Sequence, residues 1–122
     1  MRGPVNAGPS EADWRLIDVD DLGVGDPAWD LAWPASWFAV GLIGASEWSG
    51  LLAAYAAAGG VALPTAGDPW DVLDPFARAA TVHRAASAVI RAEEEGRGLD
   101  EAEDAFVKAC VRMAVGASCG AR

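Results

Sequence analysis

Positive charge is scarce in this sequence. Its 122 residues include nine Lys and Arg against 18 Asp and Glu, a formal net charge of −9. No Lys or Arg occurs between residues 16 and 77, although that stretch contains nine acidic residues. Nucleic acids and anionic membranes are recognised through clustered cations. We therefore expect neither nucleic acid nor a membrane as a partner, and the acidic stretch favours a cation or a ligand bridged by a cation.

The cysteine and histidine patterns of zinc sites are missing. Cys110 and Cys119 form no Cys-x-x-Cys motif, and His83 is the one histidine. Because a structural zinc ion takes four such ligands, we expect no zinc site. The residues that follow Met1 lack the apolar segment of a secretory signal. We therefore expect a reducing, cytoplasmic environment.

Long apolar runs are also missing. Residues 48–67 are uncharged but rich in alanine, and Gly59, Gly60 and Pro64 interrupt them. A membrane-spanning helix needs about 20 consecutive apolar residues, with basic residues outside it to set its orientation. We interpret this stretch as a buried helix and a loop. With 52% hydrophobic residues, the chain is expected to form the core of one domain or of part of one.

Helix start signals recur after residue 25. Asp26 and Asp68 each precede a proline, a pair typical of a helix whose first turn is capped by the Asp side chain. Ser46 is the predicted cap of a helix between these two. Asp100 begins a capping box that Glu103 completes, which predicts the start of a last helix.

Apolar residues recur at helical spacing. Trp29, Trp33 and Trp37 lie four residues apart, which predicts a buried stripe rather than an exposed aromatic platform. Pro34 predicts a kink or a fresh helical start. His83 is interpreted as a core histidine rather than a general base, because it belongs to the apolar face predicted for residues 68–92. That face comprises Val72, Leu73, Phe76, Ala79, Ala80, His83, Ala86 and Ile90. The inward face predicted for the last helix comprises Ala102, Phe106, Ala109, Cys110 and Met113.

A β-prone run and an acidic loop precede these helices. Residues 14–19 predict a short strand or hairpin with Asp18 at its end. Magnesium binds one or two carboxylates together with phosphate oxygens and water, so Asp18 is a candidate ligand of a metal–nucleotide complex. A calcium loop of the EF-hand type is disfavoured. Asp18, Asp20 and Gly23 match its pattern, but Leu22 and Trp29 stand where ligands belong.

Residues 17–32 resemble the second signature of the aminoglycoside phosphotransferase family, commonly written I-D-[WF]-[DE]-x-x-x-x-G-D-P-x-x-D-L-A. The matching residues are Ile17-Asp18, Asp20, Gly25-Asp26-Pro27 and Asp30-Leu31-Ala32. That family has the protein-kinase-like fold. The resemblance implies a mainly α chain that forms the C-terminal helical part of that fold, with a short strand or hairpin at its N-terminus.

The resemblance also implies roles for four acids. Asp18 would hold Mg²⁺ against the β- and γ-phosphates of ATP, and Asp20 would be an auxiliary acid of the metal site. Asp26 would cap the following helix and Asp30 would brace the catalytic loop, so both are structural. The implied activity is transfer of the ATP γ-phosphate to a hydroxyl group of a small molecule.

Two parts of the family pattern do not occur in residues 1–122. The catalytic loop H-G-D-x-x-x-x-[NQ] is missing, and the one lysine, Lys108, lies in the predicted last helix rather than in a nucleotide-binding lobe. We therefore expect a partial C-terminal lobe whose missing parts lie N-terminal to Met1. It would consist of a linker (1–13), a metal-binding strand with an acidic loop and helix start (14–32), and a helical subdomain (33–122). Alone, it is expected to be catalytically inactive.

Two other functions fit the same residues. The chain could be a non-catalytic helical module that binds a partner, or a divalent-cation-binding domain unrelated to kinases. A partial lobe exposes apolar surface, so we expect self-association. Asp21 and residues 93–95 are interpreted as solvated acids, Cys110 as a small core residue and Cys119 as an exposed thiol near the C-terminus.

Overall fold

The computed structural model describes residues 15, 17–19 and 23–119, with side chains as far as Ala117. Four helices make up most of this part of the chain: α1 (Trp29–Ala39), α2 (Ala45–Ala57), α3 (Trp70–Glu95) and α4 (Glu101–Cys119). The described residues contain no strand. The prediction of a mainly α chain is confirmed.

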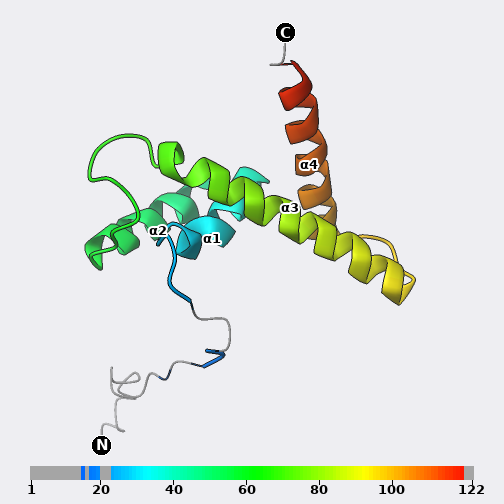
Figure 1. The fold of residues 1–122 in the computed structure, drawn as a ribbon, viewed down its shortest axis with the longest axis horizontal. Coiled ribbons are helices and arrows are strands. Elements are labelled where there is room, and N and C mark those ends of the chain that lie inside the picture. The colour runs from blue at the N-terminus through cyan, green and yellow to red at the C-terminus, as the bar shows by residue number, and fades with distance from the viewer. Residues whose placement is uncertain (1–14, 16, 20–22, 120–122) are drawn as a thin grey trace, which may run out of the picture.

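Helix α3 is the centre of the arrangement. It packs against α1 and against α4, while α2 packs against α1. Its 26 residues make it about 39 Å long at 1.5 Å per residue. In Figure 1, α1 and α2 lie along one half of α3, and α4 rises steeply from the other half. The described chain is thus an open cluster of helices, with α3 as the element that joins its two halves.

The strand predicted for residues 14–19 is not formed in its described part. Residues 15 and 17–19 have no regular secondary structure and are exposed; Trp14 and Leu16 lie outside the described residues. A strand needs a second strand for its backbone N–H and C=O groups. The described part of the chain offers no such partner.

Helix α1 begins at Trp29, two residues after Pro27, which the first Asp-Pro pair predicts as the first helical residue. The carboxylate of Asp26 accepts a hydrogen bond of 2.9 Å from the backbone N–H of Ala28, which satisfies a donor of the first turn. Pro34 does not give the helix a fresh start, because α1 runs through it as far as Ala39. The missing N–H of Pro34 removes one hydrogen bond of the helix without ending it.

The start of α2 differs from its prediction. The helix begins at Ala45, its cap is Gly44, and no side chain caps it. Ser46 is therefore a residue of the first turn. The predicted apolar stripe is present: Trp48 is buried, and Leu51, Leu52 and Tyr55 are half-buried against the core. The ring of Trp48 stacks on that of Phe38 with centroids 5.3 Å apart, which joins α2 to the end of α1.

Helix α3 ends at the predicted glycine, but its buried face coincides only in part with the predicted one. Asp68 accepts a 2.9 Å hydrogen bond from the N–H of Trp70, and Gly96 ends the helix with a φ of 63° that favours glycine. The buried residues are Leu73, Ala77, Ala80, Thr81, Ala85, Ala88 and Ala92. The predicted face is confirmed in part: Leu73 and Ala80 are buried and Val72 and Phe76 half-buried, whereas Ala79, His83, Ala86 and Ile90 are exposed. Alanine side chains are small, so they let α1 and α4 approach α3 closely. Both faces of α3 carry apolar residues, and the contacts with α1 and α4 decide which of them is buried.

The tryptophan stripe of α1 is not core. Trp29 is 52% exposed, and Trp33 and Trp37 are each 38% exposed. The buried side of α1 is formed instead by Leu31, Ala32, Ala35 and Ser36. Trp29 and Trp33 contact the α3 residues Phe76 and His83 at the edge of the α1–α3 contact. All three indoles are therefore half-buried or exposed there rather than enclosed in the core.

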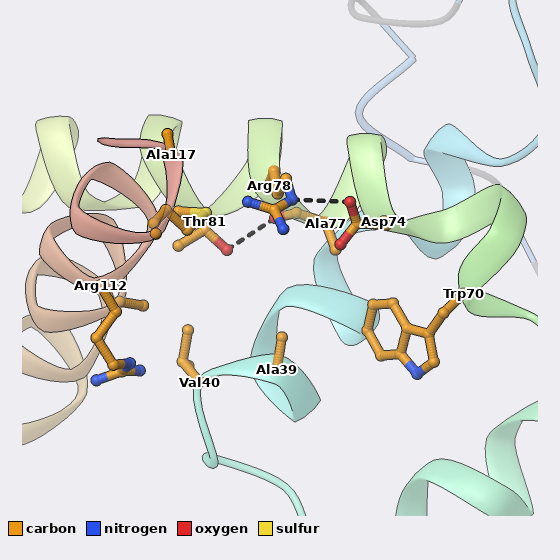
Figure 2. A pocket seen from close by; sticks show the side chains of 12 residues that line it. Ala39, Val40, Trp70, Asp74, Ala77, Arg78, Thr81, Arg112 and Ala117 are labelled. Atoms are coloured by element: carbon orange, nitrogen blue, oxygen red, sulfur yellow. Dashed lines mark hydrogen bonds and ion pairs between the residues drawn. The ribbon is translucent and has the colours of Figure 1, made fainter. Parts of the chain in front are cut away.

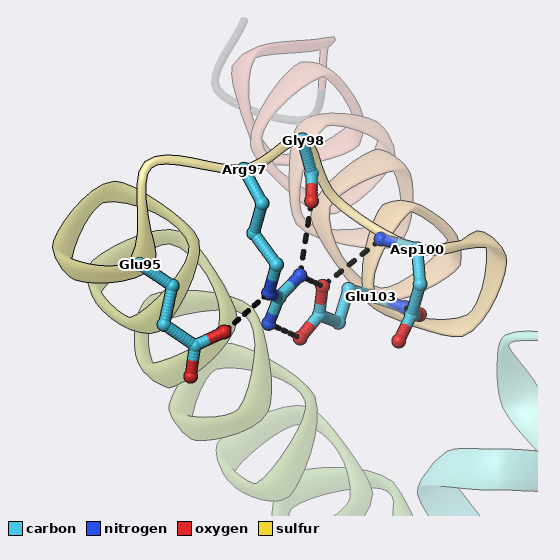
Figure 3. A network of polar contacts seen from close by, with 5 residues as sticks. All are labelled: Glu95, Arg97, Gly98, Asp100 and Glu103. Carbon is cyan, nitrogen blue, oxygen red and sulfur yellow. Dashed lines mark hydrogen bonds and ion pairs between the residues drawn. The ribbon is translucent and has the colours of Figure 1, made fainter.

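The joint between α3 and α4 is held by polar contacts (Figure 3). The backbone N–H of Glu103 donates to Asp100 at 2.8 Å and the N–H of Asp100 donates to Glu103 at 3.0 Å, so the predicted capping box is confirmed. Arg97 donates two hydrogen bonds to the same Glu103 carboxylate, at 2.8 and 2.9 Å, and one to Glu95. These contacts raise the pKa of Arg97 and lower the pKa of Glu103 to about 2.

The buried core of the described residues is small. Most of its apolar members are alanines, and the larger ones are Leu31, Trp48, Leu73 and Phe106. Alanine buries little apolar area, so each helix contact contributes less to stability than a contact between leucines would. None of the described helices combines the length and hydropathy that crossing a bilayer requires.

Candidate functional site

Asp18 is the predicted metal ligand that the structure describes. It is exposed and has a φ of 57°, the left-handed region that Asp tolerates better than most residues other than glycine. Its carboxylate has no hydrogen bond or ion pair with the rest of the described chain. Asp20, the second predicted metal ligand, and Asp21 lie outside the described residues.

Asp26 and Asp30 lie close together at the start of α1, one turn apart. Asp26 uses its carboxylate to cap the helix, as described above. Asp30 is exposed in the first turn, where a negative charge is favoured by the partial positive charge of the helix N-terminus. Neither carboxylate has a contact with Asp18 among the interactions of the described residues. Of the four acids in the signature, Asp26 and Asp30 therefore lie together at the start of α1. Asp18 precedes them in the chain and has no hydrogen bond or ion pair with either among the described residues.

Among the described residues, Asp18 is not part of a cluster of metal-ligating side chains. The described part of the chain has no group of three or more His, Cys, Asp or Glu residues able to surround a metal ion. One free carboxylate is what Mg²⁺ uses when phosphate oxygens and water fill its other positions.

A second cluster involves His83, and the prediction that it is a core residue is wrong. His83 is exposed, and its ring meets the edge of Trp33 with centroids 5.6 Å apart. The guanidinium of Arg84 lies 5.6 Å from the centre of the same indole, within the range of a cation–π contact. His83 has no carboxylate partner among the described residues. His83 and Arg84 thus both pack against Trp33. This arrangement does not resemble the pairing of a catalytic histidine with an acidic residue.

A cavity of about 580 Å³ lies between the end of α1, the first half of α3 and the last half of α4. Figure 2 shows Trp70 at one end, Arg112 at the other and the Asp74–Arg78 pair on the α3 wall. Asp74 accepts a 2.8 Å hydrogen bond from Arg78. The cavity is lined by neither Asp18, Asp26 nor Asp30. It is therefore separate from the signature acids, and its residues are too far apart in the sequence to have been predicted.

Cys110 is half-buried on α4, as a small residue that packs toward α3. Burial raises the pKa of its thiol, which makes the reactive thiolate form rarer at neutral pH. The side chain of Cys119 lies outside the described side chains. Cys110 therefore has the properties of a packing residue rather than of a nucleophile.

Comparison of the chain with family models, with curated proteins and with solved structures found no match.

Proposed function

We propose that this chain is the helical part of an ATP-dependent small-molecule phosphotransferase with a protein-kinase-like fold. The proposal is carried by one observation: Asp18, whose carboxylate has no partner among the described residues, precedes α1 and the Asp26 carboxylate at its start at the spacing of the aminoglycoside phosphotransferase signature. The resemblance in residues 17–32 supplies the chemistry, and the local geometry at Asp26 is compatible with it. The mainly helical fold of the described residues is also compatible with the C-terminal part of such an enzyme.

On this proposal Asp18 holds Mg²⁺, and Asp20 contributes to the same site. The ion would neutralise charge on the β- and γ-phosphates of ATP during transfer to a hydroxyl acceptor. Asp26 fixes the direction in which the chain enters α1, and Asp30 orients the backbone next to the site. These two residues act by positioning.

Chemistry by residues 1–122 alone is not expected. Phosphoryl transfer depends on a group that orients the acceptor and on cations that hold the phosphates. The sequence has no His-Gly-Asp motif, and its one lysine, Lys108, pairs with Asp104 on α4 at 2.6 Å.

The proposal is tested by titrating the purified chain with Mg²⁺ and ATP in a calorimeter and by measuring phosphate release. We expect saturable binding that Asp18→Asn abolishes, with no steady turnover. Asp71→Asn is the matched control, because Asp71 is an exposed acid of the first turn of α3 and is outside the signature. Equal binding by wild type and Asp18→Asn would contradict the proposal. Steady ATP turnover that Asp18→Ala abolishes would contradict the expected inactivity.

A second candidate function is that of a non-catalytic helical module that binds a partner. The observation in its favour is the exposed apolar face of α3, opposite its buried alanines. Val82 and Ile90 are 54% and 57% exposed and, with Ala86 between them, follow helical spacing. A divalent-cation-binding domain unrelated to kinases is the remaining alternative, and it requires Mg²⁺ or Ca²⁺ binding without a nucleotide.

A further inference from the structure

The cavity of about 580 Å³ between α1, α3 and α4 is separate from the proposed metal–nucleotide site, because none of the described signature acids lines it. Its volume is within the range of pockets that hold small molecules. Its floor is formed by short, buried side chains, Ala77 and Thr81 of α3 and Ala109 of α4. Because these side chains are short, the three helices leave a hollow above them.

Trp70 gives one end of this cavity an aromatic surface (Figure 2). Its ring stacks on Phe38 with centroids 6.0 Å apart and on Trp48 with centroids 5.8 Å apart. Trp70 is nevertheless only half-buried, so part of the indole is left to line the cavity. A ring that two others already hold loses little freedom when a ligand packs against it. This end of the cavity therefore favours a flat aromatic ligand.

Met113 lines the α4 side of the same cavity and is half-buried. Methionine is unbranched and adapts to the shape of its neighbours, and its sulfur makes favourable contacts with aromatic rings. The volume admits more than one ring, since a cavity of about 150 Å³ is sufficient for benzene. Two fused rings can thus contact Trp70 and Met113 together.

The polar groups on the α3 wall are largely paired with one another. The hydroxyl of Thr81 donates to the backbone carbonyl of Ala77 at 2.7 Å. Arg78 donates to Asp74 at 2.8 Å, so this pair adds no net charge. Asp74 uses one oxygen for that bond, and an ionised carboxylate can accept further hydrogen bonds. Asp74 is one helical turn from Trp70 on the same face of α3, so it can accept one donor from a ligand that packs on the indole.

Arg112, at the other end of the cavity, stands among charges that balance its own. It also lines a neighbouring hollow together with Glu101, Asp104 and Lys108. Lys108 pairs with Asp104 at 2.6 Å, and the two acids and two bases of this hollow have no net charge. An ion that enters the cavity would lose hydration without an excess of opposite charge to replace it. The balance of charges therefore favours a neutral ligand.

Large side chains at both ends limit the length of the occupant. Trp70 lies at one end and Arg112 at the other (Figure 2). A helix from another protein chain is about 10 Å across and extends beyond the groove it occupies. Side chains that close both ends leave room for a compact molecule instead.

We propose that this cavity binds a neutral, planar molecule with two fused aromatic rings and one hydrogen-bond donor. One ring packs on Trp70, the other contacts Met113, and the donor bonds to the carboxylate of Asp74. This site and the metal–nucleotide site share no described residue, so either can exist without the other.

The test uses 2-naphthol as the probe, at neutral pH, with binding measured by calorimetry and by NMR. We expect saturable binding in the millimolar range or tighter, with the largest shifts at the Trp70 indole and the Met113 methyl group. Decahydro-2-naphthol has the same two rings without aromaticity and should bind about two- to tenfold more weakly. 2-Naphthoate should also bind more weakly, because Asp74 repels its carboxylate. Equal affinity for the two alcohols, tighter binding of 2-naphthoate, or no binding of 2-naphthol by chain of normal helical content would overturn the assignment.

Trp70→Leu tests the aromatic contact directly. It removes the aromatic surface from the cavity, so the affinity for 2-naphthol should fall by about two- to tenfold. Trp37→Leu makes the same substitution at an indole that does not line this cavity, and it should leave the affinity unchanged. Equal losses in both variants would mean that 2-naphthol binds to exposed indoles in general, which contradicts the proposal.

Gly116→Leu provides a second test, because Trp70→Leu also removes the stacking on Phe38 and Trp48. Gly116 is exposed and lines the cavity, and a Cβ there would have no atom within 4 Å, so the leucine is added without a clash. The affinity for 2-naphthol should fall by about tenfold or more, the usual effect of a misfit in an apolar pocket. Gly50→Leu adds the same side chain at an exposed glycine of α2 with equal space around its Cβ, and should not change the affinity.

An unchanged affinity in Gly116→Leu would contradict the site. Sedimentation of the same variant distinguishes the other occupant, a second copy of the chain. If Gly116→Leu abolishes self-association and leaves the affinity for 2-naphthol unchanged, the cavity is a contact between copies and the proposal is wrong.

Discussion

Asp26 and Asp68 make the same hydrogen bond at the starts of two helices that pack against each other. Each carboxylate accepts the backbone N–H two residues ahead, at 2.9 Å, and a proline follows each Asp. The bond satisfies one of the N–H groups that a helix start leaves without a partner. The two bonds therefore stabilise the turns from which α1 and α3 begin.

Replacing either cap is expected to destabilise the chain measurably. Asp26→Ala and Asp68→Ala should each lower the free energy of unfolding by about 1 kcal/mol, the usual effect of losing an N-cap side chain. Asp30→Ala and Asp71→Ala are the matched controls, since they remove an acid from the first turn but no capping hydrogen bond. Urea unfolding followed by circular dichroism measures all four. If all four variants lose the same free energy of unfolding, the negative charge rather than the hydrogen bond of Asp26 and Asp68 stabilises the helix starts.

These helix starts were predictable because capping is a local property. The residues that make each bond lie within three positions of one another, so the sequence pattern contains the whole interaction. The capping box of Asp100 and Glu103 was predictable for the same reason. Ser46 shows the limit of such patterns, because Gly44 occupies the cap position and α2 starts two residues earlier than expected.

Leu73 tests the small core. It is fully buried in the cluster that joins α1, α2 and α3. Leu73→Ala should cost about 2–5 kcal/mol, because it removes apolar contacts and leaves a cavity. Val61→Ala, at a loop position that is 79% exposed, should change stability by less than about 0.5 kcal/mol. The comparison of urea midpoints checks this, and a loss below about 1 kcal/mol in Leu73→Ala would contradict the described packing.

The buried faces were harder to predict than the helix starts. On α3 many positions on two faces are alanine or valine, so the apolar period did not select one of them. Which face of α3 is buried depends on its contacts with α1 and α4, whose residues are far away in the sequence. Trp29, Trp33 and Trp37 illustrate the same difficulty, since their spacing defines a stripe but not the direction in which the stripe faces.

The contact of Arg97 with Glu103 should depend on pH in a defined direction. The pKa of Glu103 in the folded chain is lowered from 4.5 to about 2, first by the Arg97 hydrogen bonds. A lowered pKa of an acid means that its stabilising effect is complete above the unfolded pKa and is lost as the pH falls toward the folded value. The difference in melting temperature between wild type and Glu103→Gln should therefore be constant above pH 4.5 and shrink between pH 4.5 and about 2. A difference that grows on acidification would contradict the contact.

The exposed apolar face of α3 predicts self-association. Wild-type chain should show a sedimentation coefficient that rises with concentration, because apolar surface is removed from water at a contact between copies. Val82→Glu and Ile90→Glu should shift the chain toward the monomer. Val61→Glu introduces the same charge at an exposed loop position and should have little effect. A wild-type chain that stays monomeric at all concentrations would count against the module function.

The role of Asp18 could be predicted only through the resemblance of residues 17–32. An exposed Asp with no partner is common on protein surfaces, and no local pattern distinguishes a metal ligand from a solvated acid. The cavities are a different case. Their walls combine residues from three helices, so the sequence contained no signal for them before the fold was known.

The most direct measurement follows the amide NMR signals of residues 17–19 and 23–26 during titration with Mg²⁺, with ATP and with both together. The proposed function predicts large, saturable shifts with both ligands present, small shifts with either one alone, and none with both in Asp18→Asn. Shifts of equal size with Mg²⁺ alone would identify a cation-binding domain instead. The absence of any shift in wild-type chain, or equal shifts in Asp18→Asn, would contradict the assignment of Asp18 as the ligand of a metal–nucleotide complex.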